Sequence, residues 1–437
     1  MALPIALQSL IGSSLGLVDN LMVGSLGETA IAAVGAGIQP FFVFWMIMFG
    51  FSSGCATFMA QFWGTKDVKN IKKTLGFAIT ASSSIGLIFF IIAMFFPQIF
   101  VSIYTDNPEV KALAIDYVRA GAVCFLALGI TVPITSCLRA VQQTRLPLYT
   151  STFAFCMSTF LNYVFIFGNF GAPELGVFGA ALATSIARVL ELLVVLFVVF
   201  YNKNIISGKV REYFGWQKGF VPKVFNNAIP TAINETLWGV GTSLYVAAYA
   251  RVGITAHAAV QLSVAINSVF VLAAYSIADA ALILIGQRLG AGQLDYGYEL
   301  GKRFLKISVV IGLVVGFALV VSARPIIGIF SEVTPEGQRY MFYILAVFGA
   351  TMFLSLINSV NIVGILRAGG DTKYPMIVEG AVVWLIGVPL AFLSAVVLRL
   401  PIYLCVLLVR MEEFIKLFIF LKRFFLKKWV RKVTDDM

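Results

Sequence analysis

The sequence predicts an all-α polytopic membrane protein with twelve transmembrane helices in two six-helix lobes. Three observations support this fold class. First, 60% of the 437 residues are hydrophobic and only 12% are charged, which is too little polar surface for a water-soluble globule of this length. Second, apolar runs of about twenty residues, the length needed to cross a bilayer, recur along the whole chain. Third, the two halves of the chain resemble each other.

The apolar runs follow one another with short polar connections. They are continuous rather than alternating, which favours helices over membrane strands. The first run has no basic lead and no small-residue cleavage site, so we expect a retained helix rather than a signal peptide. Met1 lies almost inside this run, so the natural start is left open. The predicted segments are 2–23, 36–63, 75–96, 112–138, 148–168, 176–200, 225–249, 257–286, 304–329, 338–366, 375–398 and 401–422.

Lysine and arginine gather after every even-numbered segment, whereas the connections after odd-numbered segments are poor in both. By the positive-inside rule, this alternation places both termini in the cytoplasm. The net charge of +11 then reflects attraction to anionic lipid at one membrane face and implies no nucleic-acid partner. The basic residues are Lys66, Lys69, Lys72, Lys73, Arg139, Arg145, Lys203, Lys209, Arg211, Lys218, Lys223, Arg288, Lys302, Arg303, Arg367, Lys373 and those of the tail "LKRFFLKKWVRK".

An internal repeat relates the two halves. A shift of 226 residues aligns "LGETAIAAV" with "VGITAHAAV", and a shift of 228 aligns "LRAVQQTRLPLY" with "LRAGGDTKYPMI". Because each half has an even number of helices, the repeat is parallel, an arrangement in which one lobe can rock against the other around a central cavity. The predicted division is an N-terminal lobe 1–200, a basic linker 201–224, a C-terminal lobe 225–422 and a basic tail 423–437.

The chemistry-bearing residues point away from an enzyme. The sequence has no nucleotide-binding glycine loop, so active transport would draw on an ion gradient. The five cysteines lie at irregular spacing, and the one histidine, His257, has no partner at ligand spacing. We therefore expect no structural metal, no cofactor and no catalytic residue. His257 is interpreted as structural.

Four stretches resemble the multidrug and toxic compound extrusion (MATE) transporters. They are "LGLVDNLMVGSLG", "LRAGGDTKYP", "GQRLGAG" and "FLNYVFIFGNFGAPELGVFGAALATSIAR". The resemblance implies a monomeric, bacterial, multi-pass protein of the cell membrane. It also implies export of small organic, often cationic, compounds in exchange for H⁺ or Na⁺. The alternative is a flippase or exporter of lipid-linked saccharides from the same superfamily, which would favour several arginines in the cavity to hold phosphates; only Arg188 lies deep in a segment.

Asp19 is the strongest candidate for the coupling site. A carboxylate at membrane depth costs roughly 2.5–3.5 kcal/mol on insertion scales, and such groups usually serve function. A proton or a cation neutralises the charge and removes the cost. The resemblance implies partners at Asn162 and Thr184, where the sequence matches the family pattern. Some members carry a second aspartate four residues after that asparagine, and here Ile166 replaces it, which argues against tight Na⁺ binding.

Glu235 is the second candidate and matches a glutamate that some branches of the family use in the C-terminal lobe. Those branches pair it with an aspartate in the tenth helix. This sequence has no acid there, and Asn358 or Asn361 is the nearest polar substitute. The predicted function of this group is ion or substrate binding.

The remaining polar residues of the apolar segments are weaker candidates. Arg188 and Glu191, three residues apart on one helix face, are expected to pair. Aromatic faces suit organic cations, and an acid would attract them, so four residues are possible cavity-lining positions. These are Asp279, Trp238, Tyr245 and Trp45. A further group is interpreted as interfacial or as pairs within one lobe: Glu379, Arg410, Glu412, Glu413 and Lys416.

Overall fold

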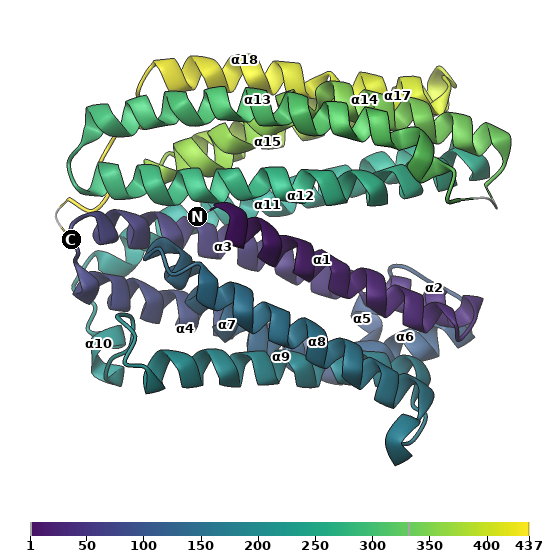
Figure 1. Cartoon of the computed structure of the whole chain (residues 1–437), viewed down its shortest axis with the longest axis horizontal. Helices are drawn as coiled ribbons and strands as arrows, with labels where there is room; N and C mark the ends of the chain where they lie inside the picture. Colours follow the sequence, from purple (N-terminus) through teal and green to yellow (C-terminus); the bar gives the residue numbers. More distant parts are fainter. Residues whose placement is uncertain (1, 331–332, 436) are drawn as a thin grey trace. The chain divides into compact units, whose positions relative to one another are not determined.

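The computed structural model describes residues 2–330, 333–435 and 437. These residues form helices joined by short turns and contain no strand. They divide into two compact units, each packed mainly within itself (Figure 1). Unit 1 comprises residues 3–59 and 66–225, and unit 2 comprises residues 60–65 and 226–437. The predicted all-helical fold class with two repeated halves is confirmed.

Unit 1 contains the first six predicted membrane segments. The fourth segment is two helices that meet at Ala122, and the amide oxygen of Asn107 caps the first of them by accepting from the backbone N–H of Glu109 and Val110. Such a cap satisfies donors that a helix start leaves free. The helices are α1 (Ala2–Gly24), α2 (Glu28–Gly37), α3 (Gln39–Gly64), α4 (Val68–Phe95), α5 (Gln98–Val101), α6 (Pro108–Gly121), α7 (Val123–Ala140), α8 (Arg145–Phe167), η1 (Asn169–Gly171), α9 (Gly176–Tyr201) and α10 (Val210–Phe214).

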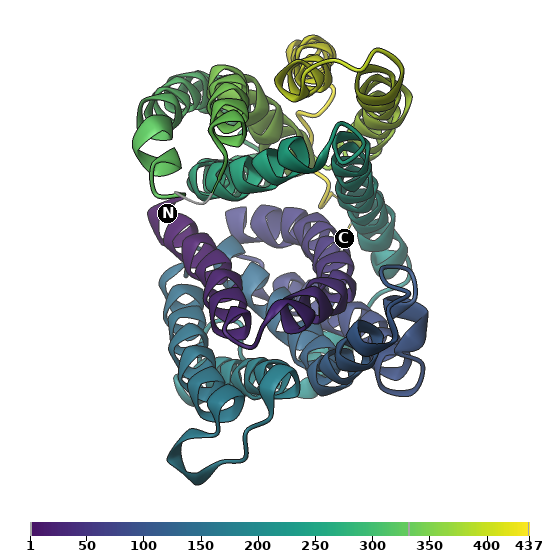
Figure 2. The same ribbon diagram turned by 90° about the vertical axis from the view of Figure 1, so that its right-hand side faces the viewer.

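Unit 2 contains the last six segments and is less regular. Its eleventh segment alternates α- and π-helical stretches, and its twelfth breaks at Met411. Figure 2 views the helices nearly end on. The elements are α11 (Phe220–Tyr249), α12 (Ile254–Gly290), α13 (Leu294–Ile327), α14 (Pro335–Ser359), η2 (Val360–Leu366), α15 (Lys373–Val382), η3 (Val383–Gly387), α16 (Val388–Phe392), η4 (Leu393–Val397), α17 (Ile402–Arg410) and α18 (Glu412–Phe425).

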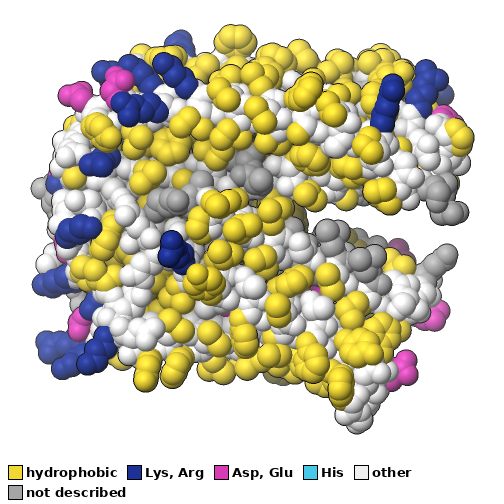
Figure 3. Space-filling view, in the orientation of Figure 1, with side chains coloured by type: hydrophobic (Ala, Val, Ile, Leu, Met, Phe, Trp, Pro, Cys, Tyr) yellow, Lys and Arg dark blue, Asp and Glu magenta, His cyan; other side chains and the backbone are white. Residues whose placement is uncertain are grey.

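The apolar runs become helices of membrane-spanning length. Among the described residues, nine helices are long and apolar enough to cross a bilayer. The other three predicted segments correspond to α1, α11 and the pair α17 and α18, which are not among these nine. Hydrophobic side chains cover the flanks of each unit, as expected for surfaces that face lipid, and Lys and Arg side chains of unit 1 gather mainly at the end where α10 lies (Figure 3).

The linker between the units is ordered rather than extended. Lys72 on α4 lies 2.7 Å from Glu212 on α10, and the indole N–H of Trp216 donates to the carbonyl of Lys73. The hydrogen bond from Lys72 holds the pKa of the Glu212 carboxyl below its usual range. The basic linker is therefore attached to α4, and Lys73, which the sequence places in a loop, is only 4% exposed.

The C-terminal tail also folds back onto its own unit. Trp429 is fully buried, and Arg431 donates to the carbonyls of Gly369 and Gly370. A Cβ at Gly369 would lie 1.7 Å from the Trp429 carbonyl oxygen, so only glycine permits this approach. The tail thus closes over the "LRAGGD" turn that follows the tenth segment.

Candidate functional site

The Asp19 carboxylate lies where α1 meets α8 and α9 in unit 1. The amide nitrogen of Asn162 on α8 donates a short hydrogen bond to Asp19 Oδ1. The hydroxyl of Thr184 on α9 also hydrogen-bonds this carboxylate. The structure therefore brings together the three residues that the sequence predicts for the ion site of the first lobe.

The surroundings of Asp19 supply little further charge. Ile166, one helical turn beyond Asn162, is fully buried in an apolar cluster that includes Val23 and Val177. The position at which the family resemblance implies a second acid in some members is therefore part of the hydrophobic core. Asp19 is a single carboxylate held by neutral hydrogen-bond donors.

The nearest cation to this site is already paired. Arg188 lies one turn beyond Thr184 on α9, and its Nη1 lies 2.8 Å from Glu191 Oε2. Ser151 donates to the other oxygen of Glu191, and Gln8 donates to Ser151. The predicted pair of Arg188 and Glu191 is confirmed, and it leaves Asp19 without a salt-bridge partner among the described residues.

A carboxylate in this environment can be neutralised by a proton or a small cation. Neutralisation removes the cost of holding a charge in a region of low dielectric constant. Asn162 and Thr184 can donate to the ionised form, and both side chains also carry acceptor oxygens for a protonated carboxyl group or a cation. The three side chains are thus compatible with loaded and empty states.

Glu235 in unit 2 has a different partner from the one expected. It forms a buried salt bridge with Arg367, and among the described residues no hydrogen bond joins it to Asn358 or Asn361. Arg367 directly follows the tenth segment, as predicted, but it is 1% exposed, so its charge faces the interior of the unit. The distance in sequence between Glu235 and Arg367 hides this contact, although an arginine directly after an apolar segment is a signal for such a partner.

The two asparagines have separate environments. Asn358 donates from Nδ2 to the Glu413 carboxylate at 2.7 Å and to the Glu413 carbonyl at 2.8 Å. Asn361 is 1% exposed, and its amide oxygen and amide nitrogen have no hydrogen-bond partner in the part of the chain that the structure describes. Asn361 lies within the π-helical stretch η2, a local geometry that often accompanies functional sites.

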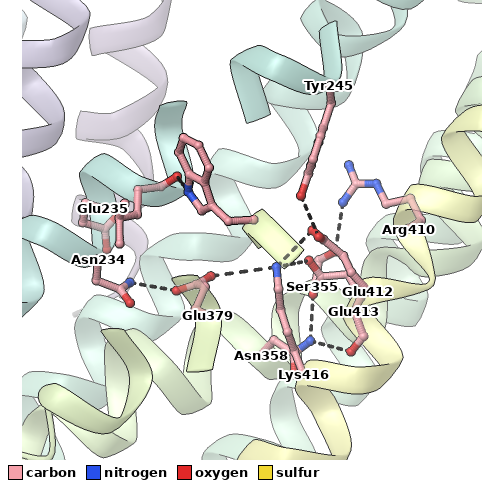
Figure 4. Close-up of polar contacts among 12 residues, drawn as sticks. Asn234, Glu235, Tyr245, Ser355, Asn358, Glu379, Arg410, Glu412, Glu413 and Lys416 are labelled. Carbon is pink, nitrogen blue, oxygen red and sulfur yellow. Dashed lines mark hydrogen bonds and ion pairs between the residues drawn. The ribbon is translucent and has the colours of Figure 1, made fainter. Parts of the chain in front are cut away.

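A buried polar network that the sequence did not assign to a site surrounds Lys416 (Figure 4). Lys416 Nζ lies 3.0 Å from Glu412, 3.3 Å from Glu413 and 4.0 Å from Glu379. Asn234 on α11 donates to Glu379 at 2.7 Å. These acids pair within one unit. Of the two interpretations that the sequence allowed, interfacial residues or pairs within one lobe, the structure shows the second.

The four possible cavity residues lie in dissimilar places. Tyr245 is 7% exposed and donates from its hydroxyl to Glu412 at 2.6 Å. Trp238 packs against the same apolar cluster as Tyr245, whereas Trp45 on α3 is 45% exposed. Asp279 is partly buried on α12. These four positions remain predictions as cavity residues.

Two repeated bundles of membrane-length helices, each with buried carboxyl groups, define a two-lobed membrane transporter. The chain belongs to the MatE family, whose sequence model matches residues 4–164 and 228–393. Both matched stretches together cover most of the two repeated halves. The family assignment expected from the sequence motifs is confirmed.

Individual relatives agree with this assignment. The chain is 24% identical over 402 residues to "Probable multidrug resistance protein NorM" of Thermotoga maritima, covering 90% of this chain and 84% of that protein. It is 26% identical over 399 residues to "Uncharacterized transporter YisQ" of Bacillus subtilis, covering 90% and 86%. Among solved structures, a MATE protein crystallised with MaL6 superimposes with a TM-score of 0.88 at 16% identity, covering 98% of this chain and 96% of that one.

Proposed function

We propose that this protein is a secondary active antiporter that exports small organic, often cationic, compounds in exchange for an inward-moving cation. The names of its relatives include multidrug resistance proteins, which supports the class of cargo. A parallel repeat of two helical lobes supports transport by alternating access. The proposed location is a bacterial cell membrane, with the protein as a monomer. Both termini face the cytoplasm in this proposal, because the connections after even-numbered segments are basic.

The observation that carries the proposal is the Asp19 site. A single carboxylate on an apolar helix, held by Asn162 and Thr184 from two other helices, is a group whose charge changes when an ion binds. Because the three side chains come from α1, α8 and α9, a change in that charge alters how these helices pack. In this mechanism, ion binding at Asp19 repacks or bends α1 and thereby expels the cargo.

The proton is the coupling ion that this site favours. Na⁺ binding in proteins depends on several oxygen ligands around one ion, and the buried Ile166 removes the second carboxylate that the related sites offer. A proton needs only one carboxylate oxygen. Na⁺ therefore remains the second arm of the experiment rather than the main proposal.

The flippase alternative has less support. Phosphate-bearing lipids call for arginines whose guanidinium groups are available. Here Arg188 is paired with Glu191, and Arg367 is paired with Glu235. The half-buried Arg188 and the buried Arg367 thus already have carboxylate partners in their own unit.

The test is accumulation of a fluorescent cationic dye inside everted membrane vesicles, whose lumen corresponds to the outside of the cell, under an imposed pH gradient or an imposed Na⁺ gradient. We expect the parent protein to accumulate dye in vesicles with an acidic lumen and Asp19→Asn to fall to the level of vesicles without the protein. Asp106→Asn, an exposed acid of the same unit, is the matched control and should transport as the parent does. Equal transport by Asp19→Asn under both gradients would show that Asp19 does not carry the coupling ion.

A further inference from the structure

The network around Lys416 contains more buried acid than buried base. Three carboxyl groups, those of Glu379, Glu412 and Glu413, face the ammonium of Lys416 and the guanidinium of Arg410. All three glutamates are less than 10% exposed. With every group ionised, the network would therefore hold one uncompensated negative charge in the interior of the unit, which is costly.

The internal repeat relates this network to the Asp19 site. The 228-residue shift pairs Thr184 with Glu412, and the 226-residue shift pairs Asp19 with Tyr245. In unit 1 the acid is on the first helix and the hydroxyl on the sixth. In unit 2 the Tyr245 hydroxyl, on the first helix, donates to the Glu412 carboxylate on the sixth. The same two positions thus hold an acid and a hydroxyl in both units, with the two groups exchanged.

Three further pairs of positions follow the same shifts. Arg188 corresponds to Lys416, so each unit has a cation one helical turn beyond Thr184 or Glu412. The hydrogen bond from Gln8 to Ser151 in unit 1 corresponds to the bond from Asn234 to Glu379 in unit 2. Unit 2 is therefore a second version of the same site, with Glu379 in place of Ser151.

The neighbouring amides can accept a hydrogen bond from a protonated carboxyl group. Asn234 and Asn358 are 4% and 3% exposed, and each donates from Nδ2 to a carboxylate of the network. Within the described ranges, the amide oxygen of each has no hydrogen-bond partner. A buried acceptor without a donor costs about 1–3 kcal/mol. A protonated carboxyl group would supply a donor, since an amide that turns over accepts through its oxygen.

The backbone also leaves room for the exchanged pair. Gly387 ends the π-helical stretch η3, and a Cβ there would lie 2.1 Å from the Tyr245 hydroxyl and 2.3 Å from Glu412 Oε2. Any side chain at this position would displace the pair. The helix that carries Glu379 therefore also forms the space in which Tyr245 and Glu412 meet.

We propose that Glu379 and Glu412, arranged around Lys416, form a proton-binding site of unit 2 that is the counterpart of the Asp19 site. The site takes up one proton, which converts one carboxylate to a carboxylic acid and leaves the network neutral. A proton fits better than a metal cation because the Lys416 ammonium, which has no acceptor, already lies among the carboxylates. The role of this site in transport rests on the proposed function, whereas proton binding does not.

Charged and titratable groups face the two acids from each neighbouring helix, and all of them influence the site. Glu412 and Glu413 share α18 with Lys416, and α14 contributes the neutral Ser355 and Asn358. The titratable and charged groups on the other helices are Glu235, Tyr245 and Tyr249 on α11, Tyr275 on α12, Glu379 on α15 and Arg410 on α17.

The test is infrared spectroscopy of the full-length protein in lipid nanodiscs, titrated from about pH 5 to about pH 9, the range in which buried carboxyl groups titrate. Protonated carboxyl groups absorb separately from carboxylates, so the method counts them without any transported compound. All variants are made in the Asp19→Asn background, which silences the carboxyl group of unit 1. The result is therefore independent of the proposed antiport.

We expect the signal of a slowly exchanging, protonated carboxyl group to appear as the pH falls. Glu379→Gln and Glu412→Gln should each reduce it, whereas Glu299→Gln, an exposed acid paired with Lys302, should leave it unchanged. Tyr245→Phe removes only a hydroxyl that donates to Glu412, so it should move the midpoint of the signal to higher pH. An unchanged signal in both glutamine variants would overturn the proposal, and so would an unchanged midpoint in Tyr245→Phe if the glutamine variants do not fold.

Discussion

Replacing Gly387 by alanine should destabilise unit 2 through one identifiable collision. The added Cβ would lie 2.1 Å from the Tyr245 hydroxyl oxygen and 2.3 Å from Glu412 Oε2. Real Cβ atoms do not approach other heavy atoms so closely, so Tyr245 or Glu412 must move. Either movement breaks the 2.6 Å hydrogen bond between them.

The size of the effect follows from three contributions. Overpacking a tight site costs about 1–3 kcal/mol, and losing a hydrogen bond to a charged group costs about 1.5–3 kcal/mol. Alanine in place of a helical glycine returns about 0.5–1 kcal/mol. The expected net loss is about 2–5 kcal/mol, and for a unit of 150–250 residues each kcal/mol lowers the melting temperature by about 2–4 °C.

The assay is the melting temperature of the purified protein, read by the loss of its monodisperse peak in size-exclusion chromatography after heating. Tyr245→Phe removes the atom that the new Cβ strikes first, so the double variant should recover part of the loss. Gly35→Ala, in a helix with no heavy atom within 4 Å of the added Cβ, is the control and should not lower the melting temperature. Full stability of Gly387→Ala, or no recovery in the double variant, would refute the packing described for this site.

Three other outcomes follow from the structure. The hydrogen bond from Lys72 lowers the pKa of the Glu212 carboxyl, so this contact stabilises the linker at pH values above the unfolded pKa of about 4.3. The stabilisation is lost as the pH falls through the lower pKa of the folded state. Hydrogen exchange of residues 205–216 should therefore rise on acidification in the parent and be high at every pH in Glu212→Gln. Gly369→Ala should expel the tail because of the 1.7 Å approach to the Trp429 carbonyl, so limited proteolysis should cut the tail faster than in the parent. Ile166→Asp should cost about 3–5 kcal/mol by burying an unpaired acid, and NaCl should raise its melting temperature more than that of the parent if Na⁺ can enter the site.

The helices and their grouping could be predicted because hydrophobicity is a local property of the sequence. The apolar runs correspond to helices, although 112–138 is interrupted at Ala122 and 375–398 contains the π-helical stretches η3 and η4. Hydrogen-bond register within a helix leaves no trace in hydropathy. The π-helical geometry could therefore not be predicted from hydropathy.

The contacts of Asp19 could be anticipated because a family pattern supplied Asn162 and Thr184 as partners. The contact between Glu235 and Arg367 was missed, since hydropathy does not report how far each helix is rotated about its own axis. Without that rotation, residues 132 positions apart cannot be matched.

The network of unit 2 has only a partial signal in the repeat. Comparing Asp19 with its counterpart Tyr245 shows an acid replaced by a hydroxyl, and suggests a lost charge. Comparing Thr184 with its counterpart Glu412 shows the opposite exchange. Only contact between the two helices, which the structure supplies through the Tyr245 to Glu412 hydrogen bond, reveals that the two changes compensate each other.

In the tenth and eleventh helices of unit 2, the π-helical stretches couple the register of the backbone hydrogen bonds to rotation about the helix axis. Residues in an α-helix follow one another by about 100° of rotation, so a shift of the hydrogen-bond register by one residue at η2 (Val360–Leu366) would turn the residues beyond it by a comparable angle. Arg367, which follows η2 directly, would then turn away from Glu235. A change in backbone hydrogen bonding is thereby converted into rotation, without sliding one packed helix past another.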